Sequence, residues 1–217
     1  MTEYNTYIFD LDGTLLDTLD DLTASVNYAL RRYGMPEHSR ENIRRFVGNG
    51  VRLLMMRAVP GGEENVQFED CFQTFREHYM AHSLDTTRPY DGIPELLAEL
   101  KRKGKRLAVV SNKFCAATQE LCRHFFPDTI EVAIGENEAE GIRKKPAPDT
   151  VIKALSQLGV GKENAVYVGD SDVDLMTARN SQLPCISVLW GFREKDFLKE
   201  NGATTFAVAP KDILSFY

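Results

Sequence analysis

Short runs of β-branched and aromatic residues recur along the chain, and they alternate with longer segments in which apolar residues follow a helical spacing. The short runs predict β-strands at residues 4–10, 105–110, 130–135, 165–169, 185–190 and 204–209. The amphipathic segments predict helices at residues 92–103, 115–125, 148–159 and 172–181. Strands that alternate with helices of this length form βαβ units. We therefore expect an α/β protein with a Rossmann-like parallel sheet and helices on both faces.

One connection does not follow this alternation. Residues 16–86 contain several amphipathic segments, among them DDLTASVNYALRRYG and FEDCFQTFREHYMAHS, and no convincing strand. A connection of this length without structure of its own is uncommon inside a compact domain. We therefore expect residues 16–86 to form an all-helical cap, inserted into a core made of residues 1–15 and 87–217.

Composition and charge limit the classes of function to consider. The chain is 43% apolar and 27% charged, as in ordinary globular proteins, and its net charge of -6 without a basic stripe argues against nucleic acid as a partner. No apolar run has the length of a membrane span, the first residues lack the pattern of a signal peptide, and the four cysteines form no CxxC motif. We expect a cytoplasmic protein with reduced thiols and no membrane partner, either a monomer or a dimer.

Polar residues stand at the carboxyl ends of three predicted strands. Asp10, Ser111 and Asp170 each end or directly follow such a strand. In an open parallel sheet, ligands bind beyond the carboxyl ends of the strands. These residues therefore predict a binding or catalytic site at one edge of the sheet.

Carboxylates gather at the same predicted edge. Asp12 lies two residues beyond Asp10, and Asp174 lies one helical turn beyond Asp170. Acids in one place repel one another, and a hard divalent cation with oxygen ligands relieves the repulsion, which favours magnesium. The alternative is that some of these aspartates only cap helices or form turns, as Asp often does. That alternative is weak for Asp10, because a strand end inside an apolar run needs no acid.

Lys145 is the candidate cation of this site. In the segment RKKPAPDTV, Pro146 and Pro148 restrict the backbone just before a predicted helix, so the loop can direct an ammonium group at a phosphate. A solvated basic turn is the alternative interpretation of the same segment. The segment alone does not decide between the two.

Taken in order, DLDGT, the Ser-Asn pair at 111–112, KPAP and GDSDVD resemble the four motifs of haloacid dehalogenase-type phosphatases. The motifs extend over almost the whole chain, and the helical insert follows the first motif, where that superfamily carries a helical cap. The segments VGNG, RPYDGIPELL and VGDS look most like those of phosphoglycolate phosphatases and their relatives. The resemblance implies a magnesium-dependent phosphoric monoester hydrolase that acts on a small phosphorylated metabolite.

The resemblance also implies a catalytic role for each matching residue. Asp10 would attack phosphorus and form an aspartyl-phosphate. Asp12 would protonate the leaving oxygen and then activate water, and the first of these tasks requires a raised pKa. The Ser111 hydroxyl and the Asn112 backbone would bind phosphoryl oxygens, while Lys145 would offset the charge of both nucleophile and phosphate.

The remaining implied roles concern the metal. Magnesium would be held by Asp10, the backbone carbonyl of Asp12 and Asp170. Asp174 would orient water around the metal. Together with Lys145, the metal would make the site attractive to anions in spite of the negative net charge.

The insert is expected to set substrate specificity, and some branches of the family fit it poorly. Residues 1–100 contain no lysine, which argues against phosphonate-cleaving members that form a Schiff base with a cap lysine. Leu22 stands where sugar-phosphate mutases carry a histidine, and Gly169 stands where they carry an acid. Dehalogenases lack the acid found here at Asp12.

Candidate substrate contacts remain in the insert. They are a glycine-rich turn and the arginines around it, namely Gly48, Asn49, Gly50, Arg45, Arg52 and Arg57. Glycines let backbone amides approach a substrate closely, and an arginine could clamp a carboxylate with two hydrogen bonds. The alternative is that Arg52 and Arg57 only lie on a solvated helix face.

Phosphoglycolate is the first substrate hypothesis. The same chemistry on pyrophosphate, a sugar phosphate or a nucleotide monophosphate stays open, and a phosphomutase fits less well. A non-enzymatic alternative is a phospho-accepting receiver domain, which also combines acids, a hydroxyl and a lysine on a parallel sheet. Such domains are shorter and lack a helical insert, and an acid/base at Asp12 would shorten the lifetime of their phospho-aspartate.

Overall fold

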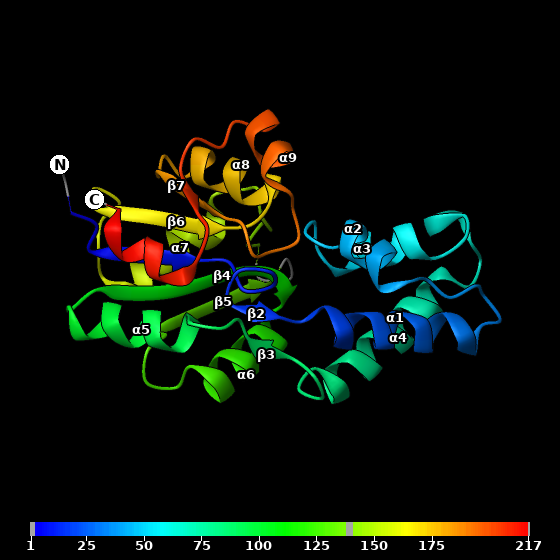
Figure 1. Ribbon diagram of the computed structural model, residues 1–217. Coiled ribbons are helices and arrows are strands. Elements are labelled where there is room, and N and C mark those ends of the chain that lie inside the picture. The colour runs from blue at the N-terminus through cyan, green and yellow to red at the C-terminus, as the bar shows by residue number, and fades with distance from the viewer. Residues whose placement is uncertain (1–2, 138–140, 217) are drawn as a thin grey trace. The chain divides into compact units, whose positions relative to one another are not determined.

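The computed structural model describes residues 3–137 and 141–216. The chain divides into two compact units (Figure 1). Met1–Leu16 and Pro89–Tyr217 make the first, here called the core unit, and Asp17–Arg88 make the second, called the helical unit.

A six-stranded parallel sheet with the order β5-β4-β1-β6-β7-β8 forms the centre of the core unit. Its strands are β1 (Thr6–Phe9), β4 (Arg106–Phe114), β5 (Val132–Glu136), β6 (Ala165–Gly169), β7 (Cys185–Val188) and β8 (Phe206–Ala207). Phe9 lies opposite Val109 of β4 and Val168 of β6. Because β1 and β6 are neighbours in this register, Asp10 and Asp170 leave the sheet at the same edge.

Helices cover both faces of this sheet. α7 (Asp149–Leu158) and α8 (Asp172–Asn180) bury apolar side chains against the same face of β1, β4 and β6. The chain moves through β1, β4 and β5 in the opposite direction, so right-handed crossovers put α5 (Ile93–Arg102) and α6 (Cys115–Phe125) on the other face (Figure 1). The predicted α/β fold class is thereby confirmed.

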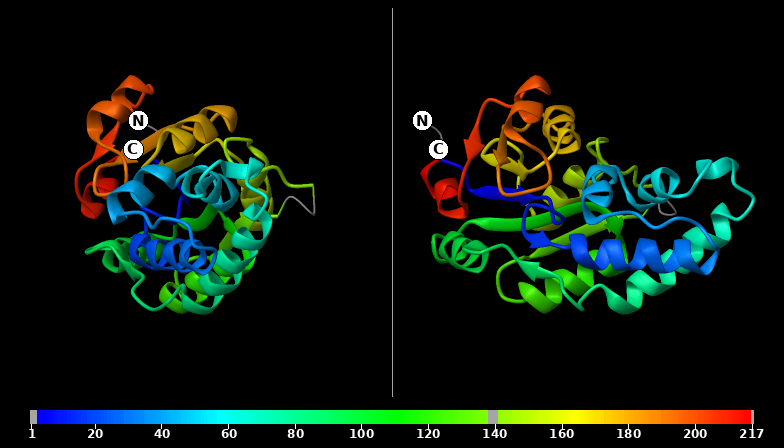
Figure 2. Two further views of the ribbon diagram at one scale, coloured as in Figure 1. Left: turned by 90° about the vertical axis from the view of Figure 1, so that its right-hand side faces the viewer. Right: turned by 45° about the vertical axis from the view of Figure 1, so that its right-hand side comes forward.

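The helical unit contains α1 (Leu19–Arg32), α2 (Arg40–Phe46), α3 (Val51–Ala58), the short 3-10 helix η1 (Gly62–Glu64) and α4 (Phe68–His82). The two long helices, α1 and α4, lie side by side (Figure 2). Each buries an apolar stripe at helical spacing, with Val26 and Leu30 on α1 and Phe75 and Tyr79 on α4.

The start of α1 is tied to the segment that follows α4. The buried carboxylate of Asp21 accepts hydrogen bonds of 2.5–3.1 Å from the amides and hydroxyls of Thr86 and Thr87. Although burial raises the pKa of Asp21, these hydrogen bonds outweigh it and hold the pKa below its usual value. They also fix the ends of the helical unit to each other.

Several short elements were not predicted from the sequence. β2 (Leu16–Asp17) pairs with β3 (Arg88–Pro89), and α9 (Lys195–Glu200) and the 3-10 helix η3 (Pro210–Ser215) follow later in the chain. Elements of two to six residues are too short for a hydrophobic period to be recognised. The strand expected at residues 105–110 is longer than predicted, since β4 continues to residue 114 with a register shift.

Candidate active site

Asp10 directly follows β1, whose four residues are all buried. Its Oδ1 accepts a 2.7 Å hydrogen bond from the Leu11 amide and lies 2.8 Å from Nζ of Lys145. The chain then turns at Gly13, with a φ of 84°, and a Cβ there would lie 2.5 Å from Oδ2 of Asp170. Glycine therefore lets the turn approach the neighbouring strand end.

Asp174 lies at the start of α8, where it forms a capping box with Ser171. Its Oδ2 accepts hydrogen bonds from the Ser171 amide (3.1 Å) and hydroxyl (2.6 Å). Its Oδ1 accepts hydrogen bonds from the Tyr167 hydroxyl (2.9 Å) and from Nζ of Lys145 (2.8 Å). Both oxygens of this fully buried carboxylate are thus engaged, and Asp174 anchors Lys145.

Asp170 is held from the opposite side by two backbone segments. Its Oδ2 accepts a 2.7 Å hydrogen bond from the Phe192 amide, and its Oδ1 accepts one of 3.3 Å from the Thr14 hydroxyl. A Cβ at Gly191 would lie 2.3 Å from Cβ of Asp170, so glycine allows this close approach without a shift of Asp170. The Trp190 indole donates to the Thr14 carbonyl (2.9 Å) and ties the two segments together.

The buried charges shift one another's pKa values. Burial, followed by the negative charge of Asp174, raises the pKa of Asp10 well above its usual value and that of Asp170 to about 7. Burial also opposes ionisation of Asp174, but Lys145 outweighs it and lowers the pKa of Asp174. Asp10 and Asp170 are therefore short of compensating positive charge.

This shortage of positive charge suits a metal ion. One carboxylate oxygen from each of Asp10, Asp170 and Asp174 lies within 4.8 Å of the others. Asp174 already accepts four hydrogen bonds, one of them from the Lys145 ammonium, whereas Asp170 accepts two from neutral donors, so Asp10 and Asp170 are the carboxylates that fit a cation best. Oxygen-only ligands and two excess negative charges favour a hard divalent cation.

The carboxyl end of β4 brings three further polar residues to the site. Ser111 is 2% exposed, and its Oγ accepts a 3.2 Å hydrogen bond from the Lys113 amide. The Asn112 side chain donates to the carbonyl of Lys145 (3.0 Å) and accepts from its amide (2.8 Å), which fixes the lysine loop. Nζ of Lys113 lies 3.0 Å from Oδ1 of Asp12.

Sequence reasoning did not identify several residues that shape this site. Lys113 was missed because the predicted strand ended at Ser111, although a lysine directly after the Ser-Asn pair was a visible signal. Tyr167 reads as an ordinary core residue of a buried strand, and its hydrogen bond to Asp174 depends on the fold. The Asp170 side chain accepts its hydrogen bond from the backbone amide of Phe192, and such a contact cannot be predicted from the type of residue at position 192.

Within the helical unit, Arg52 is fully engaged with its neighbours. Its guanidinium pairs with Glu63 at 2.6 Å and with Glu69. It also lies over the rings of Phe68 and Phe72, at 5.1 Å and 5.5 Å from their centroids. These contacts are typical of a structural arginine.

The glycine-rich turn predicted in this unit is held by Arg57. Gly48 and Gly50 both have positive φ values, 119° and 94°, which glycine adopts without strain. Arg57 donates to the Phe46 carbonyl (2.6 Å) and to the Asn49 side chain (2.9 Å). Arg57 therefore connects both ends of the turn.

Arg45 differs from these two arginines. Its side chain is 72% exposed and pairs with Glu41, one helical turn earlier, at 3.3 Å. Exposed pairs of this kind contribute little to stability. Of the three arginines predicted as substrate contacts, Arg45 is held least firmly by its neighbours.

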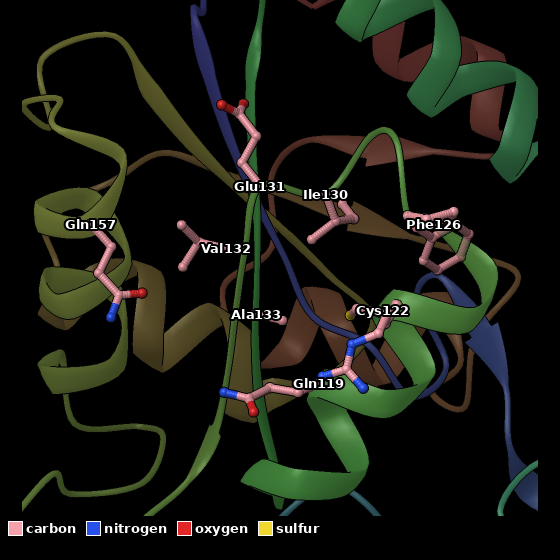
Figure 3. A pocket seen from close by; sticks show the side chains of 10 residues that line it. Gln119, Cys122, Phe126, Ile130, Glu131, Val132, Ala133 and Gln157 are labelled. Atoms are coloured by element: carbon pink, nitrogen blue, oxygen red, sulfur yellow. The ribbon is translucent and has the colours of Figure 1, made fainter.

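A cavity of about 370 Å³ lies between α6 and β5, and the aspartates of the candidate site are not among its lining residues (Figure 3). Cys122, Phe126 and Ala133 are among its lining residues. Burial, and then the negative charge of Asp12, raises the pKa of the Cys122 thiol to about 12, so the thiol stays protonated and unreactive. In the described part of the chain, no helix has both the length and the apolarity to cross a membrane.

Comparison with known proteins gives the family. Residues 7–188 match the haloacid dehalogenase-like hydrolase family. A phosphoglycolate phosphatase of Aquifex aeolicus is 33% identical over 85% of this chain and 84% of its own. A 5'-nucleotidase of Pseudomonas aeruginosa is 31% identical over 94% of this chain and 90% of its own. A crystal structure from Lactobacillus delbrueckii subsp. bulgaricus, provisionally named phosphoglycolate phosphatase, has 36% identity and a TM-score of 0.92, and covers 98% of this chain and 97% of that one.

The protein is an α/β protein with acids and a lysine at the carboxyl edge of its parallel sheet, and the family match makes it a hydrolase. The chain belongs to the haloacid dehalogenase-like hydrolase family and is similar to its phosphatases over most of its length. The resemblance noted in the sequence is confirmed, and the receiver-domain alternative is rejected.

Proposed function

We propose that the protein is a magnesium-dependent phosphatase that forms an aspartyl-phosphate on Asp10 and hydrolyses a small phosphorylated metabolite. The observation that carries the proposal is the position of Asp10, at a strand end, 2.8 Å from the buried ammonium of Lys145 and beside Asp170. A cation that close offsets part of the effect of burial on the Asp10 carboxylate and lowers the repulsion between the attacking oxygen and an anionic phosphate.

In the first step, an Asp10 oxygen attacks phosphorus and the bond from phosphorus to the leaving oxygen breaks. Asp12 gives its proton to that oxygen, so the product leaves as a neutral alcohol group. Ser111, the Asn112 backbone and Lys145 bind the phosphoryl oxygens during transfer. The contacts of Asn112 with the lysine loop support this arrangement, because they fix both groups to each other.

In the second step, water attacks the phosphorus of the aspartyl-phosphate and the bond to Asp10 breaks. Asp12, now ionised, takes the proton of the water and returns to its starting form. Inorganic phosphate leaves, and Asp10 is free to react again. Lys145 stays in place through both steps because Asp174 and Tyr167 hold it.

Magnesium would be held by Asp10, Asp170 and the backbone carbonyl of Asp12. When bound, it supplies positive charge that stabilises the transferring phosphoryl group. Asp174 takes a different role in this account, because its oxygens already accept four hydrogen bonds. It positions Lys145.

Phosphoglycolate is the first substrate proposal, supported by the names of the Aquifex aeolicus and Lactobacillus relatives. Nucleotide monophosphates are the second substrate candidate, supported by the similarity to the Pseudomonas aeruginosa 5'-nucleotidase. Gly48, Asn49, Gly50 and Arg45 are the proposed substrate contacts of the helical unit, while Arg52 and Arg57 support their surroundings.

Phosphate release from a panel of phosphorylated metabolites tests this proposal. The panel includes phosphoglycolate, nucleotide monophosphates, sugar phosphates and pyrophosphate, with magnesium, beside Asp10→Asn and an EDTA control. Preference for phosphoglycolate, lost in both controls, is the expected result. Weak activity on many substrates, lost in both controls, would keep the mechanism and reject the substrate. Activity that survives Asp10→Asn would show that Asp10 is not the nucleophile.

A further inference from the structure

Lys113 is a buried cation that the mechanism above does not use. Its side chain is 1% exposed, and its Nζ lies 3.0 Å from Oδ1 of Asp12. The Asp12 side chain is 14% exposed, so the carboxylate stands between the buried ammonium and the solvent. The lysine thus contacts the proposed acid/base from the protein side.

The backbone of β4 puts Lys113 there. Pairing with β5 shifts register between Val110 and Phe114, as a bulge does, and bulges redirect side chains. The neighbouring strand must pass close to this bulge, because a Cβ at Gly135 would lie 2.7 Å from the Lys113 carbonyl. An irregular strand and a glycine beside it are therefore needed to direct Lys113 at Asp12.

Packing alone does not explain a lysine at this position. Removing an ammonium from water costs several kcal/mol, and an apolar residue of similar size often stabilises a protein as well or better. A buried ion pair does restrict the direction of its partner. For Asp12, the restricted direction is that of the carboxylate that must reach the leaving oxygen.

We propose that Lys113 is a positioning residue that holds the Asp12 carboxylate in the direction required for proton transfer. This inference rests on the proposed function, in which Asp12 donates a proton to the leaving group and later accepts one from water. Lys113 touches neither substrate nor phosphoryl group, and it acts through Asp12. Its loss therefore affects the steps that need proton transfer and spares the one that does not.

The choice of substrate separates these steps. p-Nitrophenolate leaves without a proton, so the burst of p-nitrophenol from p-nitrophenyl phosphate reports Asp10 phosphorylation without help from Asp12. Alkyl phosphates need the proton in the first step, and the hydrolysis of the aspartyl-phosphate needs Asp12 for every substrate. Stopped-flow and rapid-quench measurements on Lys113→Met give each rate.

We expect the p-nitrophenol burst of Lys113→Met to stay within about threefold of wild type, while alkyl phosphorylation and dephosphorylation slow by at least about tenfold, within the range general acid–base catalysis supplies. Lys113→Arg, which keeps the charge, recovers most of this loss. In an Asp12→Asn background, Lys113→Met has little further effect. This double variant removes both charges of the pair, so it is informative even if the single variant folds poorly.

Lys105→Met is the matched control. Lys105 is also a buried lysine paired with a carboxylate, Glu3 at 2.7 Å, but it precedes β4 at the other end of the strand. The Lys105→Met variant should leave the p-nitrophenol burst, alkyl phosphorylation and dephosphorylation at rates near those of wild type. Equal slowing of all three rates by Lys113→Met, or an additional loss in the Asp12→Asn background, would overturn the inference. Failure of the proposed function looks different, since wild type would then form no phospho-enzyme.

Discussion

Nζ of Lys145 lies 2.8 Å from Oδ1 of Asp174, and both side chains are almost completely buried. The same ammonium lies 2.8 Å from Oδ1 of Asp10. Asp174 therefore fixes, from inside the protein, the cation that faces the proposed nucleophile. From this arrangement we expect Asp174 to support the site through Lys145.

Replacing Asp174 by Asn keeps its size and removes its charge. Lys145 keeps its pair with Asp10, so we expect a loss of stability smaller than the roughly 3–5 kcal/mol of a buried pair whose partner is left uncompensated. We also expect a fall in kcat, because Lys145 is no longer held in place. Denaturant unfolding and steady-state kinetics measure the two effects. Asp172→Asn, in the same helical turn but 26% exposed, is the control and should change both little.

Metal-free protein should lose stability as the pH rises. Burial raises the pKa of Asp170 to about 7 and that of Asp10 well above its usual value. A carboxyl whose pKa is raised by folding stabilises the folded state below its unfolded pKa of about 4, and that stabilisation is lost as pH rises through the folded value. In EDTA, the melting temperature should therefore fall as pH rises through neutrality.

Magnesium should remove this fall, because a cation offsets the ionised carboxylates. Melting curves between about pH 5 and pH 9, with EDTA or with magnesium, give the comparison. Asp170→Asn removes one of the titrating groups and should flatten the EDTA curve. Parallel curves with and without magnesium would contradict a metal site at these carboxylates.

Gly191→Ala should weaken metal binding. Its Cβ would lie 2.3 Å from Cβ of Asp170 and 2.4 Å from the Gly13 carbonyl, so the Asp170 carboxylate must shift. We expect the magnesium concentration for half-maximal activity to rise several-fold, with kcat at saturating metal less affected. Gly161→Ala is a matched control, since its Cβ would meet only the flexible end of Glu163. An unchanged magnesium requirement would argue against Asp170 as a ligand.

Substitution of two arginines of the helical unit should distinguish a residue that stabilises the fold from one that contacts the substrate. Arg52→Ala removes its pairs with Glu63 and Glu69 and its packing on aromatic rings, so we expect a loss of about 1–2 kcal/mol of stability with KM unchanged. Arg45→Ala should leave stability unchanged and raise KM for a substrate that carries a carboxylate. Thermal unfolding and KM for phosphoglycolate decide between the two roles. The opposite pattern would assign the substrate contact to Arg52.

The sequence allowed the fold class and the acidic centre to be predicted, because both depend on local patterns. Asp10 and Asp170 end strands that are recognisable from their apolar residues, and parallel strands bring their carboxyl ends to one edge. What the sequence could not reveal depends on contacts between distant segments. The bulge that directs Lys113 at Asp12 has no local sequence signal.

The predicted role of Asp174 shows the same limit. Its spacing from Asp170 was visible, and it suggested a residue that orients water around a metal. Its hydrogen bonds to Lys145 and Tyr167 join segments that are 29 and 7 residues away in the chain. Only the folded structure reveals that its oxygens accept four hydrogen bonds, which is why we propose that Asp174 positions Lys145, while its predicted role in orienting water around a metal stays a prediction.

Detection of the phospho-enzyme tests the central claim most directly. Asp12→Asn protein should accumulate it after mixing with magnesium and p-nitrophenyl phosphate, because phosphorylation needs no proton and dephosphorylation lacks its base. After acid quenching and digestion, mass spectrometry should find one hydroxylamine-labile phosphoryl group on the peptide that contains Asp10. Asp10→Asn protein should carry none. A phosphoryl group on another residue, or turnover with no labelled peptide, would contradict the account.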